Sequence, residues 1–470
     1  MPPEIAEAES PGLFRTIREA LRGSHLDYTT APVGRAVIML AVPMVMEMAM
    51  ESIFAVADVF WVAHLGADAV ATVGLTESLL TLIYTAAMGL SIGAMALVAR
   101  RTGERDPDGA SRAAGQSILL GLGFAIGIAV LAAPRAEALL RMMGASDSVV
   151  ATGHGFTRVM LGGNATVLLL FMLNAVFRGS GDAAVAMRVL WLGNLLNIVL
   201  GPCFIFGLGP FPRLGVTGAA VATNIGRGTA VVCQLVILTR GSARVKLALR
   251  HLRLDLALMR SVLRLSGSGT IQILIGTASY IGLVRIISIF GSDALAGYTI
   301  GMRVILFALL PAFGVSNAAA TMVGQNLGAR RPDRAEEAVW TATKYNMVFL
   351  GAVGVVFLAG ARLIAGFFTS DTAVQPFAIA CLRTVSLGFL FYAAGMVLTQ
   401  AFNGAGDTWT PTVINLFVFW VWEIPLAWWL STRMALGARG VFIALTVAYS
   451  TLAVVSAVLF KRGHWKHKKV

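Results

Sequence analysis

Apolar residues run along this chain in twelve long stretches that short polar segments separate. Each stretch holds roughly 20 residues or more, enough for a helix to cross ~30 Å of hydrocarbon. Backbone groups in a bilayer must bond internally, so stretches of this kind form helices. The pattern predicts an all-α integral membrane protein with twelve transmembrane helices. We expect the spans at 35–64, 69–99, 110–132, 153–177, 184–209, 214–239, 259–290, 294–325, 335–359, 376–402, 409–430 and 438–460.

The sequence also repeats itself at one offset, 225 residues. GLSIGAMALVARRTGERDPDGA at 89–110 lies over GVSNAAATMVGQNLGARRPDRA at 314–335, and FRGSGD at 177–182 lies over FNGAGD at 402–407. An offset that holds across separated segments indicates an internal duplication. Each repeat holds six spans, so we expect two six-helix lobes related by an axis along the membrane normal. The Gly-rich turns could in principle bind a phosphate, but the Lys that such a site needs is missing. We therefore expect them to be tight loops between helices.

Charge then orients the predicted spans. Of the 37 Lys and Arg residues, 25 fall on the side of the N-terminal segment, 7 fall on the opposite side and 5 fall within spans. Positive residues favour the cytosolic side, so both termini are expected there, in the inner membrane of the cell. The predicted layout is an N-terminal cytosolic segment at 1–34, an N-lobe at 35–239, a basic connector at 240–258, a C-lobe at 259–460 and a basic tail at 461–470.

Composition agrees with this picture, since 57% of the residues are hydrophobic, only 13% are charged and the mean hydropathy is +0.78. The net charge of +13 comes mainly from Lys and Arg residues in the loops on one side of the predicted membrane. We therefore expect membrane lipids rather than nucleic acid as the partner of this charge. Residues 1–34 lack the apolar core of a cleavable signal peptide. Three cysteines, Cys203, Cys233 and Cys381, lie in apolar spans without metal or disulfide spacing.

Three of the five acidic residues within spans lie in the first helix: Glu47, Glu51 and Asp58. At ~100° per residue, Glu51 and Asp58 lie ~40° and ~20° around from Glu47, so the three share one face. A carboxylate inside a membrane is costly and marks a candidate for proton or cation binding. The alternatives are neutral packing residues, or a pair between Glu47 and a cation of a neighbouring helix. Pro43, one turn before Glu47, removes a helical hydrogen bond and predicts a bend there.

The second lobe has no such column. Gln272 takes the place of Glu47 in the repeat, and the intramembrane charges are Arg285, Arg303, Arg383 and Glu423. We expect Glu423 to pair with Arg303 or Arg285, with direct contact to substrate as the alternative. The candidates for a substrate cavity are Asn194, Gln272, Tyr280, Arg303, Trp420 and Glu423.

The sequence resembles the multidrug and toxic compound extrusion (MATE) family of cation-coupled antiporters. The resemblance spans roughly 35–460 and rests on PMVMEMAMESIFAVADVFWVAHLGADAVATVGL at 43–75, the paired motifs above and NLLNIVLGPCFIFGLG at 194–209. It implies a V-shaped pair of lobes and export of bulky, often cationic compounds against inflow of protons or sodium. It also implies coupling roles for Asp58 and Asn197.

Departures from the family pattern bear on the coupling ion. Gly201 stands where the proton-coupled branch has a second Asp, and Gly276 and Tyr392 stand where the sodium-coupled branch has carboxylates. We therefore expect a proton-driven exporter of amphipathic or cationic compounds that works by alternating access. It should need no cofactor or metal beyond the ion gradient, act as a monomer and not be an enzyme. The alternatives are a sodium-coupled drug antiporter, a lipid-linked oligosaccharide flippase of the same superfamily, and an intramembrane enzyme.

Overall fold

A computed structural model describes residues 12–23, 26–241 and 244–468, and every regular element in these ranges is helical. The parts of the predicted terminal segments and connector at 1–11, 24–25, 242–243 and 469–470 lie outside the described residues. The first half contains α1 (Leu13–Arg22), α2 (Val33–Ala63), α3 (Ala67–Gly103), α4 (Pro107–Ala132), α5 (Ala136–Met142), α6 (Asp147–Gly162), α7 (Ala165–Ser180), α8 (Ala183–Phe206) and α9 (Val216–Arg240). The second half contains α10 (Leu256–Ile287), α11 (Ser292–Gly328), α12 (Pro332–Phe368), α13 (Gln375–Ser386), α14 (Phe389–Gly404), α15 (Trp409–Asn415), η4 (Leu416–Glu423), α16 (Ile424–Trp428), η5 (Trp429–Arg433) and α17 (Ala438–Lys461).

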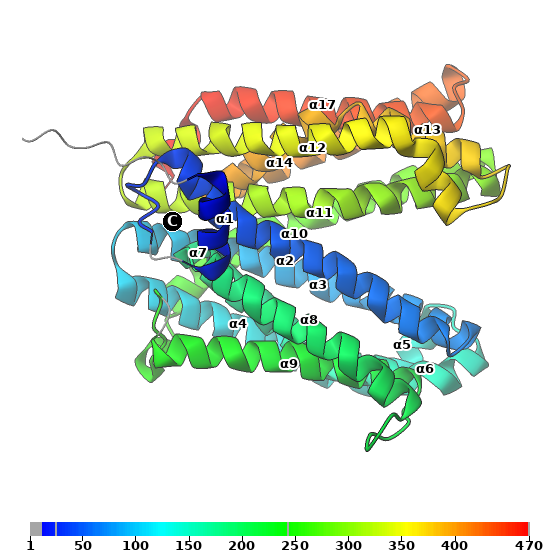
Figure 1. The fold of residues 1–470 in the computed structure, drawn as a ribbon, viewed down its shortest axis with the longest axis horizontal. Helices are drawn as coiled ribbons and strands as arrows, with labels where there is room; N and C mark the ends of the chain where they lie inside the picture. The colour runs from blue at the N-terminus through cyan, green and yellow to red at the C-terminus, as the bar shows by residue number, and fades with distance from the viewer. Residues whose placement is uncertain (1–11, 24–25, 242–243, 469–470) are drawn as a thin grey trace, which may run out of the picture.

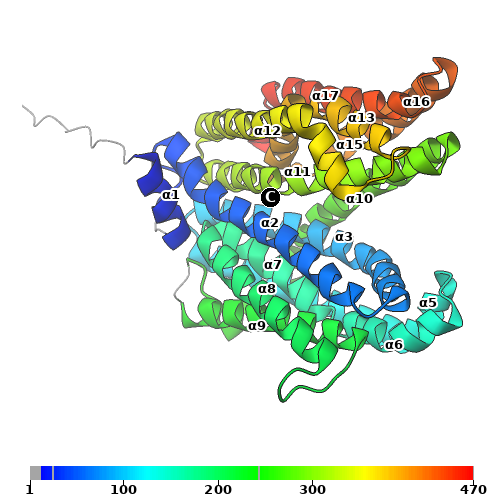
Figure 2. The ribbon, with the colours of Figure 1, turned by 45° about the vertical axis from the view of Figure 1, so that its right-hand side comes forward.

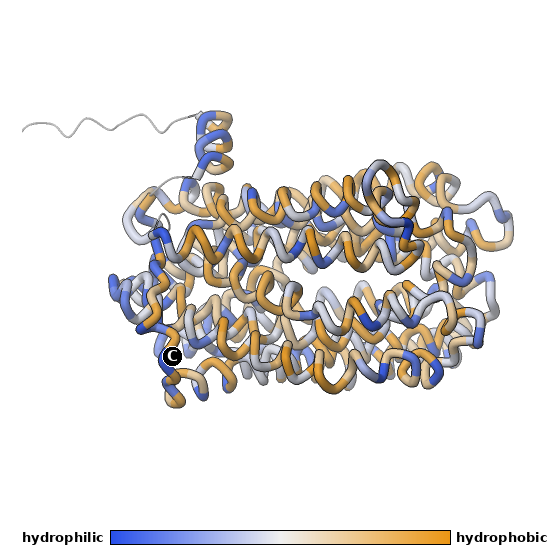
Figure 3. The backbone as a smooth tube through the Cα atoms, turned by 90° about the horizontal axis from the view of Figure 1, so that it is seen from below, coloured by the Kyte–Doolittle hydropathy of each residue, from blue (hydrophilic) through white to orange (hydrophobic). Residues whose placement is uncertain are grey.

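Eleven of the described helical segments are long and apolar enough to cross a membrane. The twelfth predicted span, 376–402, consists of α13 and α14, which meet at an angle of 59°. The eleventh contains π-helical turns, η4 and η5, between its α-helical parts. Blue polar segments gather at the two ends of the bundle in Figure 3, while hydrophobic colours follow the helices between them. The twelve-span prediction is therefore confirmed, with one span broken in the middle.

The internal repeat is visible in the helix boundaries. Helices α3 and α11 both have 37 residues, and both their first and last residues differ by 225. The turns that follow them contain Arg105 and Arg330, each with the left-handed φ that is uncommon for side chains larger than glycine, 58° and 59°. Pro107 and Pro332 then occupy the first turns of α4 and α12, where a missing N–H costs nothing. The predicted duplication is confirmed.

The two halves form separate groups of helices. In Figures 1 and 2 the groups lie against each other at the end where α1 is found, here called the α1 end, and diverge toward the end where α5 is found. The last residues of α17 also lie at the α1 end, so both described ends of the chain are on one side. This arrangement is the two-lobe fold predicted from the repeat.

Glycines allow the lobes to approach closely at the α1 end. A Cβ atom on Gly103 would lie 1.9 Å from the carbonyl oxygen of Gln325, and one on Gly328 would lie 2.2 Å from the carbonyl oxygen of Arg100. Gly103 and Gly328 are 225 residues apart, and so are the residues that they contact, Arg100 and Gln325. The two contacts are therefore equivalent in the two repeats. Only glycine fits at this approach of two helix backbones.

The segment before α2 joins both lobes at the same end. The buried hydroxyl of Tyr28 donates to the carbonyl oxygen of Gly181 in the N-lobe at 3.2 Å. From the C-lobe, Arg331 donates to the carbonyl oxygen of Thr29 at 2.7 Å, and Arg334 donates to that of Ala31. Burial raises the pKa of Tyr28 to about 12, so its hydroxyl keeps its proton across the physiological range.

Candidate functional site

The three acids of α2 all point into the N-lobe, where each meets a different helix. Glu47 is fully buried and contacts α7, Glu51 is half-buried beside α8, and half-buried Asp58 interacts electrostatically with Arg227 of α9. The predicted common face therefore exists, and it is the face that α2 turns toward its own lobe. Pro43 lies within α2, which runs without a break from Val33 to Ala63.

Glu47 is held in a buried polar network. Its Oε1 accepts from Nδ2 of Asn174 at 3.0 Å and from Nη1 of Arg178 at 3.3 Å. The Oδ1 of Asn174 in turn accepts from Nε2 of Gln234 at 2.6 Å, and all four side chains are buried. This contact is the pair with a cation of a neighbouring helix that was weighed as an alternative for Glu47, and it leaves the predicted coupling role untested. Breaking a buried pair of this kind by removing one partner is strongly destabilising, because the other charge is left without compensation.

A second cation, Arg227, lies near the other two acids. It is buried, it receives no carboxylate contact as short as a direct ion pair in the described chain, and its Nη1 donates to the hydroxyl of Tyr84 at 3.0 Å. Its guanidinium also lies 5.5 Å from the ring centre of Phe54. Both Glu51 and Asp58 attract it electrostatically from further away. One fixed positive charge therefore faces Glu51 and Asp58, and Glu77 of α3 also interacts with it electrostatically.

Two asparagines of α8 were candidates, and they have different surroundings. Asn194 is buried and donates to Oε1 of Glu51 at 3.5 Å, a long hydrogen bond. Asn197 is also buried, but it donates to Oγ1 of Thr223 at 2.7 Å and contacts none of the three acids through a hydrogen bond in the described chain. Asn194 therefore joins the acidic face, whereas Asn197 ties α8 to α9. A Cβ atom on Gly201 would make only an ordinary van der Waals contact, 3.7 Å from Cδ1 of Trp61.

Glu423 is the buried carboxyl of the C-lobe, and its predicted pair with Arg303 or Arg285 is wrong. Its Oε2 accepts from Oγ of Ser279 at 2.7 Å, and no ion pair of Glu423 occurs among the described residues. The reason is local: Glu423 ends the π-helical turn η4 and faces α10 at Ser279 rather than the exposed side chain of Arg303. A π-helical turn shifts the side chains that follow it, which the 3.6-residue period could not predict.

The remaining cavity candidates lie on the facing helices of the C-lobe. Tyr280 is partly exposed and stacks on Tyr298 with 6.0 Å between ring centres, and Trp420 donates to the carbonyl oxygen of Ile275 at 3.1 Å. Gln272 is half-buried, and its Oε1 has no hydrogen-bond partner in the described part of the chain. These residues come from α10, α11 and η4, so the structure assembles them in one lobe.

A pair of indole contacts shows how the lobes correspond at this depth. Trp191 of α8 donates to the carbonyl oxygen of Met46, just as Trp420 donates to that of Ile275. Within each pair the donor and the acceptor are 145 residues apart. The second pair follows the first by 229 residues, which is about one helical turn more than the repeat offset of 225. By this contact Glu423 occupies the place of Asn194 in the other lobe.

The partners of the acids are residues for which the sequence predicted no role. They are Arg178, Arg227, Asn174, Gln234 and Tyr84. Exposed Glu77 of α3 also had no predicted role in the site, although it interacts electrostatically with Arg227 of its own lobe and Arg303 of the other. An unpaired cation within an apolar span was the signal available for Arg227.

Comparison with known proteins identifies the family to which this fold belongs. The family model MatE matches the chain twice, at residues 43–203 and at residues 270–429, so the matches cover more than half of the chain and one falls in each lobe. The chain belongs to the MATE family. It is therefore a multi-pass membrane transporter, as the resemblance implied.

Individual MATE relatives match along nearly the whole chain. NorM of Thermotoga maritima, named a probable multidrug resistance protein, is 24% identical over 97% of this chain and 98% of its own length. A protein of Shewanella oneidensis named an FAD transporter is 23% identical over 92% of this chain and 95% of its own length. A solved structure described as the outward-facing conformation of a multidrug resistance MATE transporter is 27% identical, with a TM-score of 0.86 over 94% of this chain and 97% of that one.

Proposed function

We propose that this transporter exports small amphipathic or cationic organic compounds in exchange for protons, by alternating access of two lobes. The observation that carries the proposal is the placement of Glu51 and Asp58 around one buried guanidinium, that of Arg227. Two carboxyl groups that share one countercharge favour partial protonation, since the second negative charge has no cation of its own. In this proposal protons neutralise the two carboxyl groups.

Glu47 has a different role in this proposal. Its direct contacts with Arg178 and Asn174 join α2 to α7. We assign proton loading to Glu51 and Asp58, and we assign a positioning role to Asn197, which ties α8 to α9 through Thr223. Proton binding then weakens the attraction between α2 and α9, which allows α2 to shift as substrate leaves.

The substrate surface combines both lobes. Glu51, Asp58 and Glu77 offer negative charge from the N-lobe, while Tyr280 and Trp420 offer partly exposed aromatic rings from the C-lobe. Aromatic faces and carboxylates together favour flat organic cations. Relatives named as multidrug resistance proteins support this class, whereas the relative named an FAD transporter shows that substrates differ within the family.

The α1 end faces the cytosol in this proposal, so the lobes diverge toward the outside of the inner membrane. A monomer is sufficient, because both lobes belong to one chain. The helices that face each other across the lobes, α2 and α11, come from the two repeats.

Purified protein in liposomes tests the coupling ion directly. A fluorescent organic cation such as ethidium is followed while a pH gradient is imposed at equal sodium, and then while a sodium gradient is imposed at equal pH. We expect the pH gradient to drive ethidium movement and a protonophore to abolish it. Movement that requires the sodium gradient and ignores the pH gradient would replace protons with sodium.

A further inference from the structure

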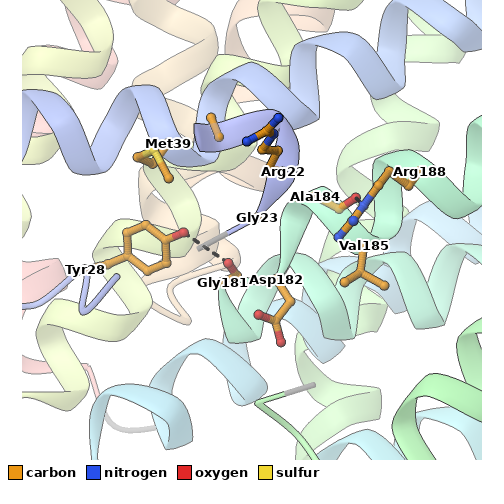
Figure 4. Close-up of a pocket in the computed structure, with 10 residues that line it drawn as sticks. Arg22, Gly23, Tyr28, Met39, Gly181, Asp182, Ala184, Val185 and Arg188 are labelled. Atoms are coloured by element: carbon orange, nitrogen blue, oxygen red, sulfur yellow. Dashed lines mark hydrogen bonds between the residues drawn. The ribbon is translucent and has the colours of Figure 1, made fainter. Parts of the chain in front are cut away.

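A pocket with two arginines that form no ion pair among the described residues lies at the α1 end, away from the acids of α2. The end of α1 and the start of α8 form its walls, and Tyr28 and Gly181 form its floor. Figure 4 shows the side chains of Arg22 and Arg188 beside Gly23. The pocket therefore lies where the first described helix meets the first lobe.

The charge of this pocket is positive. Arg22 and Arg188 form no ion pair within the described chain, and Nε of Arg188 donates only to the carbonyl oxygen of Ala184, at 3.1 Å. The single acid of the pocket, Asp182, turns away from both arginines in Figure 4 and pairs with Arg244 at 3.3 Å. In the part of the chain that the structure describes, two guanidinium groups thus lack a counterion at a place where an anion could enter.

The backbone of Gly23 makes room for such an anion. Its φ of 79° is in the left-handed region, and a Cβ atom there would lie 3.4 Å from Nη2 of Arg188. Glycine keeps this approach open, since it adopts positive φ without strain and adds no side chain at the guanidinium. Guanidinium groups that converge on one point are typical of phosphate recognition.

Helix α1 itself is strongly amphipathic. Its apolar residues Leu13 and Phe14 are 59% and 89% exposed, although the helix packs on the bundle through Thr16 and Ala20. On the helical wheel Arg15, Arg18 and Arg22 form a separate cationic face. A short helix with exposed apolar side chains next to arginines is suited to the headgroup layer of a membrane.

We infer that this pocket binds the phosphate of an anionic phospholipid, whose acyl chains lie along the exposed apolar residues of α1. Arg22 and Arg188 hold the phosphate oxygens, and Arg15 and Arg18 lie over neighbouring headgroups. A free phosphate would use the two arginines but would gain nothing from Leu13 and Phe14, which is why the lipid is the occupant.

The duplicated half supplies a contrast. The corresponding pocket of the C-lobe is lined by Arg264, Asp407 and Lys468, and there Lys468 pairs with Asp407 at 3.1 Å. The residue 225 positions after Arg188 is Val413, so the second guanidinium is missing. No counterpart of α1 covers this pocket in the described chain. The lipid site is therefore a property of the first repeat.

Lipid binding to the detergent-purified full chain tests the inference. Native mass spectrometry measures retention of phosphatidylglycerol and of phosphatidylcholine with the same acyl chains. We expect the wild type to prefer phosphatidylglycerol, and the double variant Arg22→Gln, Arg188→Gln to bind it roughly tenfold more weakly. Arg260→Gln, an exposed arginine outside the pocket, should bind it like the wild type. Millimolar inorganic phosphate should not displace the lipid.

Three results would overturn the inference: unchanged preference in the double variant, equal retention of the two lipids by the wild type, or complete displacement by inorganic phosphate. If the double variant fails to fold, Leu13→Ser with Phe14→Ser replaces it, because these exposed side chains do not support the core. That variant keeps every charge and should still lose affinity for phosphatidylglycerol. Unchanged affinity there would also contradict the proposed position of the acyl chains.

Discussion

A single carboxylate oxygen, Oε1 of Glu47, accepts from both Asn174 and Arg178 inside the N-lobe. Removing one member of such a buried pair leaves the other charge without compensation, which typically costs ~3–5 kcal/mol. We expect Arg178→Met and Glu47→Leu each to lower thermal stability in detergent strongly. The double variant should be more stable than either single variant, because it leaves no unpaired charge.

A double-mutant cycle on unfolding temperature measures this coupling. Tyr84→Phe is a suitable comparison, since it removes a hydroxyl that contacts Arg227 but leaves the Glu47 network intact. Additive effects of Glu47→Leu and Arg178→Met would show that the two side chains do not stabilise each other.

The sequence predicted which acidic residues share one face of α2 but not which residues contact them. A helical period places Glu47, Glu51 and Asp58 on one face, because it depends only on their spacing within α2. Which cation meets which acid depends on how α7 and α9 pack against α2, and spacing along one helix contains no such information. Glu423 shows the same limit, since its π-helical turn directs it to Ser279.

Among the helices, the contact between α3 and α11 depends on glycine. A side chain at Gly103 would collide with the carbonyl oxygen of Gln325, so Gly103→Val must push the two helices apart. Overpacking of this kind typically costs ~1–3 kcal/mol. We expect Gly103→Val to lower the unfolding temperature in detergent and to reduce transport, and we expect the same of Gly328→Val.

Gly123→Val in α4 is the matched control, because no atom would lie within 4 Å of the added Cβ. It should leave stability and transport close to wild type. Equal effects of Gly103→Val and Gly123→Val would indicate that helix propensity, and not the contact between the lobes, determines the outcome.

The helices were largely predictable, whereas their irregularities were not. Hydrophobic length and the 225-residue offset give the ends of α3 and α11 to within two to four residues, because both depend on local composition. The 59° angle between α13 and α14 has no such signal: Leu387 and Gly388 separate two helices within one apolar stretch, and no proline stands between them. Packing against the other helices of the lobe sets that angle.

For the whole molecule, the proposed orientation places the α1 end in the cytosol. The three native cysteines are first replaced by alanine, and single cysteines are then introduced at exposed Arg240 and at exposed Asp68, near opposite ends of the bundle. We expect a membrane-impermeant thiol reagent added to intact cells to label the cysteine at 68 and to spare the one at 240. Labelling of both positions from the same side would contradict the two-lobe topology in the membrane.

The central claim is that protons on Glu51 and Asp58 drive export, and proton movement measured together with substrate movement tests it most directly. Liposomes loaded with a pH-sensitive dye receive the wild type, Glu51→Gln, Asp58→Asn or the unrelated Gly123→Val. An amide resembles the protonated acid in size and hydrogen bonding but cannot exchange the proton. We predict that ethidium transport moves protons the opposite way in the wild type and in Gly123→Val, and that both amide variants show only the background of protein-free liposomes while remaining folded. Normal proton-coupled ethidium transport by both amide variants would contradict the account.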